Sequence, residues 1–317
     1  MKAIGGYFEL ELDKKLEYHE DAIRLNAGRN AFEYILLANS YSKIYLPFFT
    51  CDVLLEPLKK HQIIYEFYHI NEQFEPLFDY NKIKSNEAFL FTNYFGLKDS
   101  FVIQIAKFCK NLIIDSAQSF YSKPLTGIDT FYSPRKFFGV PDGAYLYSNK
   151  KLKMSFEKDV SFNRCSHLLK RIDCSAEIAY GDFIINDSSL KEQDSKEMST
   201  LTQTLLAAID YDLCADKRTR NFNFLHQALQ ETNELEIDIL NIGVPMVYPY
   251  WSDNQILRQK LLDNKVYTAI YWPNVLEWSK KNSLEYSMTK QIIYLPIDQR
   301  YDEIDLNKII KIIKNEY

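Results

Sequence analysis

The sequence lacks an excess of positive charge and any long hydrophobic run. Its 317 residues include 38 Lys and Arg against 43 Asp and Glu, a formal net charge of −5, and the basic residues are scattered. Binding along a nucleic acid requires a basic surface, so we expect no nucleic-acid partner. No run approaches the roughly 18 apolar residues of a membrane span, and the opening MKAIGGYFELELDKKLEYHED lacks the apolar core of a signal peptide. We therefore expect no membrane association and a cytoplasmic location.

The sequence also lacks the cysteine and glycine patterns of several common sites. Neither GxGxxG nor GxxxxGK[ST] occurs, so a Rossmann dinucleotide site and a P-loop have no motif to support them. The cysteines form no CxxC pair and no cluster with histidine at metal-ligand spacing, so we expect reduced thiols, mostly buried, and no metal. They are five in number: Cys51, Cys109, Cys165, Cys174 and Cys214.

What the sequence does contain is typical of a globular α/β protein. Hydrophobic residues make up 46% and charged residues 26%, which is enough to form a full core. Between residues 43 and 150, short β-branched and aromatic runs alternate with helix-like segments, which predicts a mostly parallel sheet with helices on both faces. The predicted strands are 43–47, 62–70, 88–93, 111–115, 129–133 and 144–149, and the predicted helices are 51–61 and 100–110, the latter with Ser100 as N-cap.

The C-terminal part predicts a second, smaller unit. Residues 199–232 form one helical pattern without Gly or Pro, and such a long helix commonly runs between two domains. We place a large α/β domain at 1–225 and a small α+β domain at 226–317. The stretch 151–198 is polar and predicts a long irregular loop, which is usually functional or mobile. The small domain is expected to contain strands at 244–251, 266–272 and 291–297 and helices at 254–265 and 303–317.

Two segments suggest sites for charged groups. In LNAGRNAF (25–32), Gly28 permits a tight turn and a helix follows from about Asn30, so backbone N–H groups beside Arg29 could bind a phosphate. A glycine before a helix is also common as a simple turn. In IIDSAQSF (113–120), Asp115 ends an apolar strand, at the edge where open α/β sheets bind ligands. It either caps the next turn or pairs with a cationic ligand atom such as a protonated pyridine nitrogen.

Two further segments contain a candidate nucleophile and a candidate aromatic contact. Lys136 in FYSPRKFFGVPDGAYL (131–146) is flanked by Phe137 and Phe138. Aromatic neighbours that remove the amine from water would lower its pKa and make it reactive toward a carbonyl, although a lone lysine is usually a surface charge. Ser133 could donate to a phosphate. In TNYFGL (92–97), Tyr94 serves either packing or contact with a flat ligand.

The pair Ser133 and Lys136 also matches the Ser-x-x-Lys motif of serine β-lactamases, and Ser252-Asp253-Asn254 supplies an SDN triplet. No KTG follows, no signal peptide is present, and Pro134 does not suit a serine that opens a helix. We therefore reject that interpretation.

In this order, the segments resemble the DegT/DnrJ/StrS family of pyridoxal 5′-phosphate (PLP)-dependent aminotransferases, most of which act on nucleotide-linked keto sugars. The resemblance is most specific in Asp-x-Ala-Gln (115–118), followed by Lys136 at 21 residues after the aspartate. It extends over YLPFFTCDVLLEPL (45–58), TLLAAIDYDLCADKRTRNFNFLHQAL (204–229), VYTAIYWP (266–273) and IIYLPID (292–298).

The resemblance implies a fold-type-I architecture, a homodimer and a set of roles. PLP would form a Schiff base with Lys136, Asp115 would pair with its pyridine nitrogen, and Gln118 would lie near its phenolic oxygen. The turn Gly28-Arg29-Asn30 would hold the phosphate. The small-molecule substrates would be an amino donor such as glutamate and a nucleotide-linked keto sugar. Another PLP reaction, such as decarboxylation or elimination, and a non-catalytic PLP- or sugar-binding regulator are the alternatives.

The chain departs from the family pattern at two positions. Phe131 replaces the serine usually found five residues before the lysine, while Ser133 lies three residues before it. Cys51 stands where the family has the aromatic residue that stacks on the cofactor ring, and Phe49 or Tyr94 are the candidates to replace it.

Overall fold

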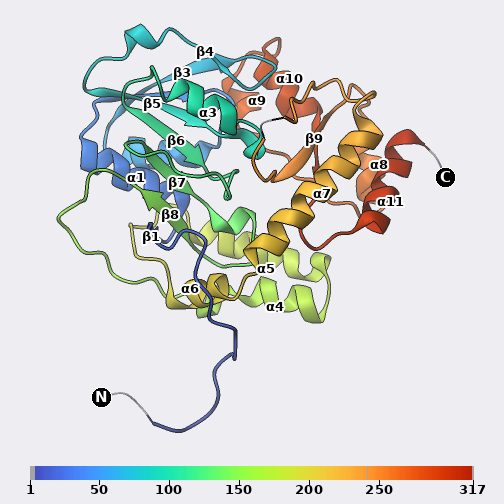
Figure 1. Ribbon diagram of the computed structural model, residues 1–317, viewed down its shortest axis with the longest axis horizontal. Helices are drawn as coiled ribbons and strands as arrows, with labels where there is room; N and C mark the ends of the chain where they lie inside the picture. Colours follow the sequence, from blue (N-terminus) through green and yellow to red (C-terminus); the bar gives the residue numbers. More distant parts are fainter. Residues whose placement is uncertain (1–3, 241, 316–317) are drawn as a thin grey trace.

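The computed structural model describes residues 4–240 and 242–315 and shows a large sheet with helices on both sides, next to a smaller C-terminal unit (Figure 1). The large sheet has the strand order β1-β8-β7-β6-β5-β2-β3-β4. Strands β3, β2, β5, β6 and β7 are parallel, whereas β8, β1 and β4 are antiparallel to their neighbours. The predicted mostly parallel sheet is confirmed. Its strands are β1 (Ile23–Leu25), β2 (Lys43–Pro47), β3 (Ile64–Ile70), β4 (Pro76–Leu77), β5 (Glu87–Thr92), β6 (Leu112–Ser116), β7 (Asp129–Tyr132) and β8 (Ala144–Tyr147).

Both faces of this sheet are buried, which explains the continuous apolar runs in the sequence. In β5, Ala88 and Leu90 face a core shared with helices α1 (Gly28–Asn39) and α2 (Leu55–Lys60). Phe89 and Phe91 face the opposite core, which continues into the C-terminal unit.

The helix expected over 100–110 is α3 (Asp99–Ile105), and Ser100 is not its N-cap because Lys98 occupies that position. The backbone N–H of Lys98 donates to Asn93 Oδ1, and Asn93 Nδ2 donates to Asp99 Oδ1. These contacts of Asn93 fix the start of the helix before Ser100.

The irregular loop expected over 151–198 instead contains two helices, α4 (Ser166–Asp173) and α5 (Ala176–Ser189). Sequence periodicity did not reveal α5 because its polar Asn186 faces inward, donating to the Pro141 carbonyl, while apolar side chains such as Ile185 lie exposed. The Ser175 hydroxyl caps the helix by accepting from Ile178 N.

The single helix expected over 199–232 is also wrong, because the chain forms α6 (Thr200–Ala207) and α7 (Tyr211–Leu229). The break needs neither Gly nor Pro, since the Asp210 carboxylate accepts from Leu213 N and starts α7 as a new helix. Helix α7 packs against both β9 (Val247–Trp251) and α11 (Glu303–Lys314) of the C-terminal unit. The domain boundary at 225 stays a prediction.

The C-terminal unit is built on β9 and the antiparallel β10 (Ile292–Pro296). Its other helices are α8 (Leu257–Asp263), α9 (Val275–Trp278) and α10 (Leu284–Gln291). The strand expected over 266–272 is wrong: among the described residues it makes one isolated bridge, Ala269 to Tyr294. Trp272 has a left-handed φ of 59° and packs its ring on Phe49, so the end of this segment turns into the core, while Tyr267 and Ile270 stay exposed. The helix expected over 303–317 reaches Lys314, and residues 316–317 lie outside the described part.

All five cysteines are free thiols, three of them buried, as predicted. Over residues 4–240 and 242–315, no helix combines the length and apolarity that a membrane crossing requires.

Candidate active site

Asp115 lies near the carboxyl end of β6, between Thr92 of β5 and Phe131 of β7 in the strand register. Its side chain is buried, and Oδ1 accepts one hydrogen bond, 2.9 Å from Ala117 N. Burial raises the pKa of this carboxyl, and the ammonium of Lys136 opposes the rise. The strand order therefore places Asp115 at the expected edge of the sheet, close enough to Lys136 for their charges to interact.

Lys136 ends a single 3-10 turn, η4 (Pro134–Lys136), directly after β7. Its side chain is exposed, so the expected removal of the amine from water by its aromatic neighbours does not occur. Phe137 and Phe138 are buried and turn into the core, where their ring centroids lie 5.7 and 5.0 Å from that of Phe120. The Lys136 side chain is thus accessible to solvent.

Cys51 is a further neighbour of Lys136. Burial raises the pKa of the Cys51 thiol, and the Lys136 ammonium is the largest influence that lowers it. Phe49 and Tyr94, the other candidates for the stacking position, are fully buried. The Tyr94 hydroxyl donates to the Phe49 carbonyl at 2.9 Å, and both rings belong to the core around Trp272. The contacts of Tyr94 therefore support packing, and Cys51 is the residue that lies near the lysine.

Gln118 contributes an amide close to the same sheet edge. Its Oε1 accepts from Phe95 N at 3.4 Å, but its buried Nε2 has no hydrogen-bond partner among the described residues. Leaving a buried donor unsatisfied costs about 1–3 kcal/mol. Such a group indicates a place where a ligand acceptor would be stabilising.

The tight turn expected at Gly28 does not form, because the helix already begins at Gly28, two residues before the predicted start. The Asn30 N–H already donates to Ala27 O, which leaves the N–H groups of Gly28 and Arg29 as the donors without a protein acceptor in the described structure. The Arg29 guanidinium contacts Glu56 at 2.5 and 2.6 Å. The Asn30 amide donates to Gln193 O. The Arg29 and Asn30 side chains are therefore already bound to protein groups. Among the groups described at this helix start, only the backbone N–H groups of Gly28 and Arg29 are left as candidate phosphate donors.

Phe131 adjoins this helix start, and Ser133 lies two residues farther along the chain. Ser133 is buried beyond the end of β7, on the same side of the strand as Phe131. A Cβ on Gly28 would meet the Phe131 ring at 4.0 Å, and the Phe131 ring centroid lies 5.9 Å from that of Phe32. Phe131 is thus a core residue that packs beside the start of α1.

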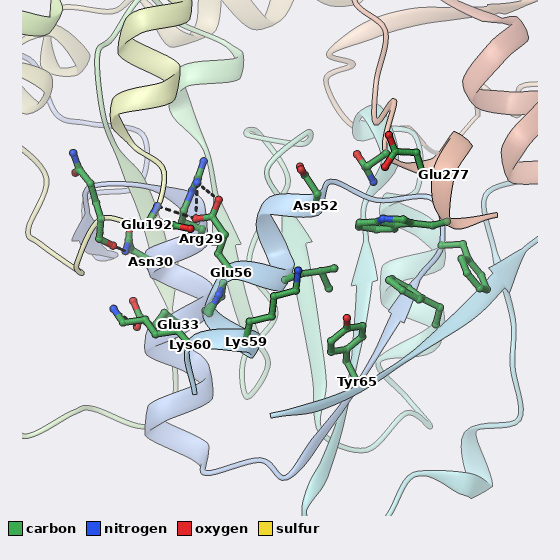
Figure 2. A pocket seen from close by; sticks show the side chains of 17 residues that line it. Arg29, Asn30, Glu33, Asp52, Glu56, Lys59, Lys60, Tyr65, Glu192 and Glu277 are labelled. Atoms are coloured by element: carbon green, nitrogen blue, oxygen red, sulfur yellow. Dashed lines mark hydrogen bonds and ion pairs between the residues drawn. The ribbon is translucent and has the colours of Figure 1, made fainter. Parts of the chain in front are cut away.

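A groove of about 840 Å³ opens beside the start of α1 (Figure 2). One wall carries charged groups of α1 and α2, including Lys59 and Lys60. The other wall is aromatic: Phe67 lies 4.8 Å from Phe48 and 5.1 Å from Trp278 between ring centroids. Sequence reasoning missed this wall because Trp278 comes from α9, more than two hundred residues along the chain from Phe67, and no local pattern joins them.

No protein-family model and no curated relative matches the sequence. Similarity is found among solved structures, at low identity. A DegT DnrJ EryC1 StrS aminotransferase from Brucella abortus has 16% identity and a TM-score of 0.61, with 93% of this chain and 85% of that chain covered. The S. venezuelae protein DesV, in complex with a ketimine intermediate, has 14% identity and a TM-score of 0.63, with 93% and 84% covered. NtdA from Bacillus subtilis, with bound cofactor PMP, has 15% identity and a TM-score of 0.64, with 93% and 72% covered.

The chain has the fold of these aminotransferases. The predicted fold-type-I architecture, with a large α/β part and a small C-terminal part, is confirmed by this likeness. The same neighbours bear out the resemblance to DegT/DnrJ/StrS proteins at the level of the fold.

Proposed function

We propose that the protein is a PLP-dependent aminotransferase that transfers an amino group from an amino acid such as glutamate to a nucleotide-linked keto sugar. The observation that carries the proposal is the position of Lys136 close enough to the buried Asp115 for their charges to interact, at the carboxyl edge of the sheet in an aminotransferase fold. The neighbours described as bound to PMP or to a ketimine have this same fold.

The residues present fit the cofactor. Asp115 is a buried carboxylate with a single hydrogen-bond donor among the described residues, and burial raises its pKa, so a cationic ligand atom beside it would stabilise its charged form. A protonated pyridine nitrogen is such an atom. Within the described part of the chain, Gln118 Nε2 is a buried donor without an acceptor, and the Gly28 and Arg29 N–H groups at the start of α1 suit an anion. When bound, PLP supplies an electron sink for negative charge that develops on a substrate carbon.

The protein residues then have distinct tasks. Lys136 Nζ would hold the cofactor covalently and, once released, move a proton to and from the substrate carbon. Asp115 would keep the ring nitrogen protonated, and the start of α1 together with Ser133 would bind the phosphate. The exposed position of Lys136 gives its amine the freedom that this exchange needs.

The groove of Figure 2 is a candidate for the acceptor substrate, because its aromatic wall suits a flat ring and Lys59 supplies a cation, whereas Lys60 is paired with Glu33 at 3.0 Å.

A homodimer is part of the proposal. Helix α5 carries apolar side chains on its outer face, with Ile178 62% and Ile185 68% exposed. The same helix contacts the turn of Lys136 through Asp187, which binds Arg135. A second copy covering α5 would remove this apolar surface from water and lie next to the candidate site.

Absorbance spectra of the purified protein with PLP test the proposal. The wild type should show the visible band of covalently held cofactor, and glutamate should change that band with release of a keto acid. Lys136→Ala should lose the band, whereas Lys110→Ala, an exposed lysine before β6, should keep it. Retention of the band in Lys136→Ala would remove this lysine from the site. A band without keto-acid release would favour a different PLP reaction or a binding role.

A further inference from the structure

Arg218 of α7 is almost fully buried, with 2% exposure, and contacts three distant segments. Its Nη2 donates to the Phe137 carbonyl at 3.2 Å, its Nη1 to the Met246 carbonyl at 3.1 Å, and its Nε to Gln299 Oε1 at 3.0 Å. The guanidinium also lies 4.6 Å from the centre of the Phe137 ring. One side chain thus joins α7, the residue after Lys136, and two segments of the C-terminal unit.

The Phe137 carbonyl receives a second donor, because Gln299 Nε2 lies 3.0 Å from it. The side chain of Gln299 therefore accepts from Arg218 and donates to the same carbonyl that Arg218 binds. This closed arrangement leaves little freedom for the peptide that follows Lys136. On the other side of the lysine, Arg135 Nη2 is bound to Asp187 at 3.1 Å.

Burial of the Arg218 guanidinium removes a charge from water, which by itself destabilises the folded protein. In the described part of the chain no carboxylate lies within ion-pair distance of its guanidinium, and burial lowers its pKa. Asp298 is the main opposing charge, but its oxygens are hydrogen-bonded to Arg300 at 2.7 and 2.8 Å. A buried charge that has hydrogen-bond acceptors but no carboxylate partner is destabilising relative to apolar residues of similar size. What the arginine provides instead is a planar set of donors that fixes three segments in one geometry.

We propose that Arg218, together with Gln299, is a positioning residue for Lys136 that ties the lysine turn to the C-terminal unit. This inference rests on the proposed function for its catalytic meaning, but the placement of Lys136 can be measured without it. Loss of the donors frees the Phe137 carbonyl, so the backbone of the turn that carries Lys136 no longer has one geometry relative to Asp115.

The test compares Arg218→Met and Gln299→Ala with Arg258→Met. Arg258 is a matched control because it also donates to two backbone carbonyls, Ala269 O at 3.3 Å and Ile292 O at 3.0 Å, and burial also lowers its pKa. The first readout is the pH dependence of acylation of Lys136 by acetic anhydride in protein without cofactor, followed by mass spectrometry with Lys110 as internal reference. Circular dichroism and thermal melting report on folding.

Arg218→Met should shift the pH profile of Lys136 acylation, and Gln299→Ala should shift it less in the same direction. In protein loaded with PLP, kcat should fall about ten- to a hundredfold with a smaller change in KM, as expected for a misplaced catalytic group. Arg218→Lys, which retains the charge and some donors, should recover part of the loss. Arg258→Met should lower the melting temperature and leave the acylation profile unchanged.

The inference is overturned if Gln299→Ala and a folded Arg218→Met both keep the wild-type acylation profile, whatever their stability. If Arg218→Met does not fold, Gln299→Ala alone decides, since its side chain is only partly buried. Failure of the wild type to hold PLP would remove the proposed function, while the acylation profiles would still decide the positioning role.

Discussion

Asp115 shows how one buried side chain constrains the chemistry of a site. Transfer of its carboxylate out of water raises its pKa, and the Lys136 ammonium is the largest influence in the other direction. A cation that binds beside Asp115 therefore gains an electrostatic partner that water does not screen. The carboxylate and the pyridine nitrogen would stabilise each other's charged forms.

Asp115→Asn should retain PLP but lose most of its turnover, because a neutral amide cannot hold the ring nitrogen protonated. Cofactor content and steady-state transamination measure the two effects separately. Asp129→Asn is the control: Asp129 is also buried, at the start of β7, and binds Asn39 and Ser148 at 2.8 Å each. Activity of Asp115→Asn within a few-fold of the wild type would contradict the assigned role.

Ser133→Ala should weaken PLP binding about ten- to a hundredfold without preventing covalent attachment, because a hydrogen bond to a charged group contributes roughly 1.5–3 kcal/mol. The backbone donors of α1 would still bind the phosphate. Titration of the cofactor-free protein with PLP measures the change. Equal affinity in mutant and wild type would mean that other residues bind the phosphate.

Phe131→Ser is the companion variant. It should bring no gain in affinity and should lower the free energy of unfolding by about 3–5 kcal/mol, because a ring buried against Phe32 is lost.

The roles of Asp115 and Lys136 stay predictions that rest on the family resemblance. The structure places Asp115 near the carboxyl end of β6 and Lys136 just after β7, at one edge of the sheet, an arrangement that the strand pattern allows. The exposure of Lys136 agrees with the usual surface position of a lone lysine and not with the desolvated one, because Phe137 and Phe138 turn into the core. Arg218 was not singled out at all, because an arginine in a helix is usually a surface charge and its partners are distant in sequence.

At the scale of elements, the loop that follows Lys136 is fixed by α6. Asp142 is fully buried and accepts from Ser199 N at 2.8 Å, from Ser199 Oγ at 2.7 Å and from the Thr202 hydroxyl. Gly143 next to it has a φ of +119°, and an added Cβ would lie 3.1 Å from Pro134 of the lysine turn. The start of α6 and the lysine loop therefore depend on the same carboxylate.

Asp142→Ala should lower the free energy of unfolding by about 3 kcal/mol or more, since several buried donors lose a charged acceptor, and should also weaken PLP binding. Asp302→Ala is the matched control, because Asp302 caps α11 far along the chain from this loop and its loss should cost about 1 kcal/mol. Urea unfolding and PLP titration of both variants measure these effects. Unchanged PLP affinity in Asp142→Ala would separate the loop from the site.

Elements with a local cause were the predictable ones. Strands β2, β5, β6 and β7 were expected within a residue or two, because short apolar runs buried on both faces leave a strong signal. Helix α5 and the break before α7 were not expected. The orientation of α5 depends on the contact of Asn186 with the distant Pro141 carbonyl. The break before α7 arises because Asp210 acts as an N-cap inside a segment whose pattern is helical throughout.

At the scale of the whole molecule, the two units share one hydrophobic cluster. It runs from Phe89 and Phe91 on the sheet to Tyr248 and Tyr294 in the C-terminal unit. Local patterns indicate which residues are apolar, but not that the two units meet in this cluster. Arg218 crosses the same boundary, which connects the stability of the whole molecule to the geometry of the lysine turn.

His19 lies in the segment before β1. Its side chain attaches this segment to the large α/β part through Tyr147 of β8 and the Phe120 carbonyl. Its imidazole is 1% exposed, with Nε2 2.7 Å from the Phe120 carbonyl and Nδ1 3.2 Å from the Tyr147 hydroxyl. Burial lowers the pKa of His19 to about 4, from an ordinary value of 6.5. The folded protein therefore holds a neutral imidazole under conditions in which an unfolded chain would protonate it.

Between about pH 6.5 and pH 4 the unfolded state binds more protons at His19 than the folded state, so stability falls as the pH falls through this window. The shift corresponds to a loss of about 3 kcal/mol. His19→Gln keeps a donor for the Phe120 carbonyl but does not titrate, so it should be less stable than the wild type at neutral pH and lose less stability on acidification. Urea unfolding at several pH values gives the free energy of unfolding of both proteins. The carboxyl groups that titrate in the same range are identical in the two proteins, so their effect cancels in the comparison. Parallel curves for the two proteins across this window would show that His19 is not the group responsible.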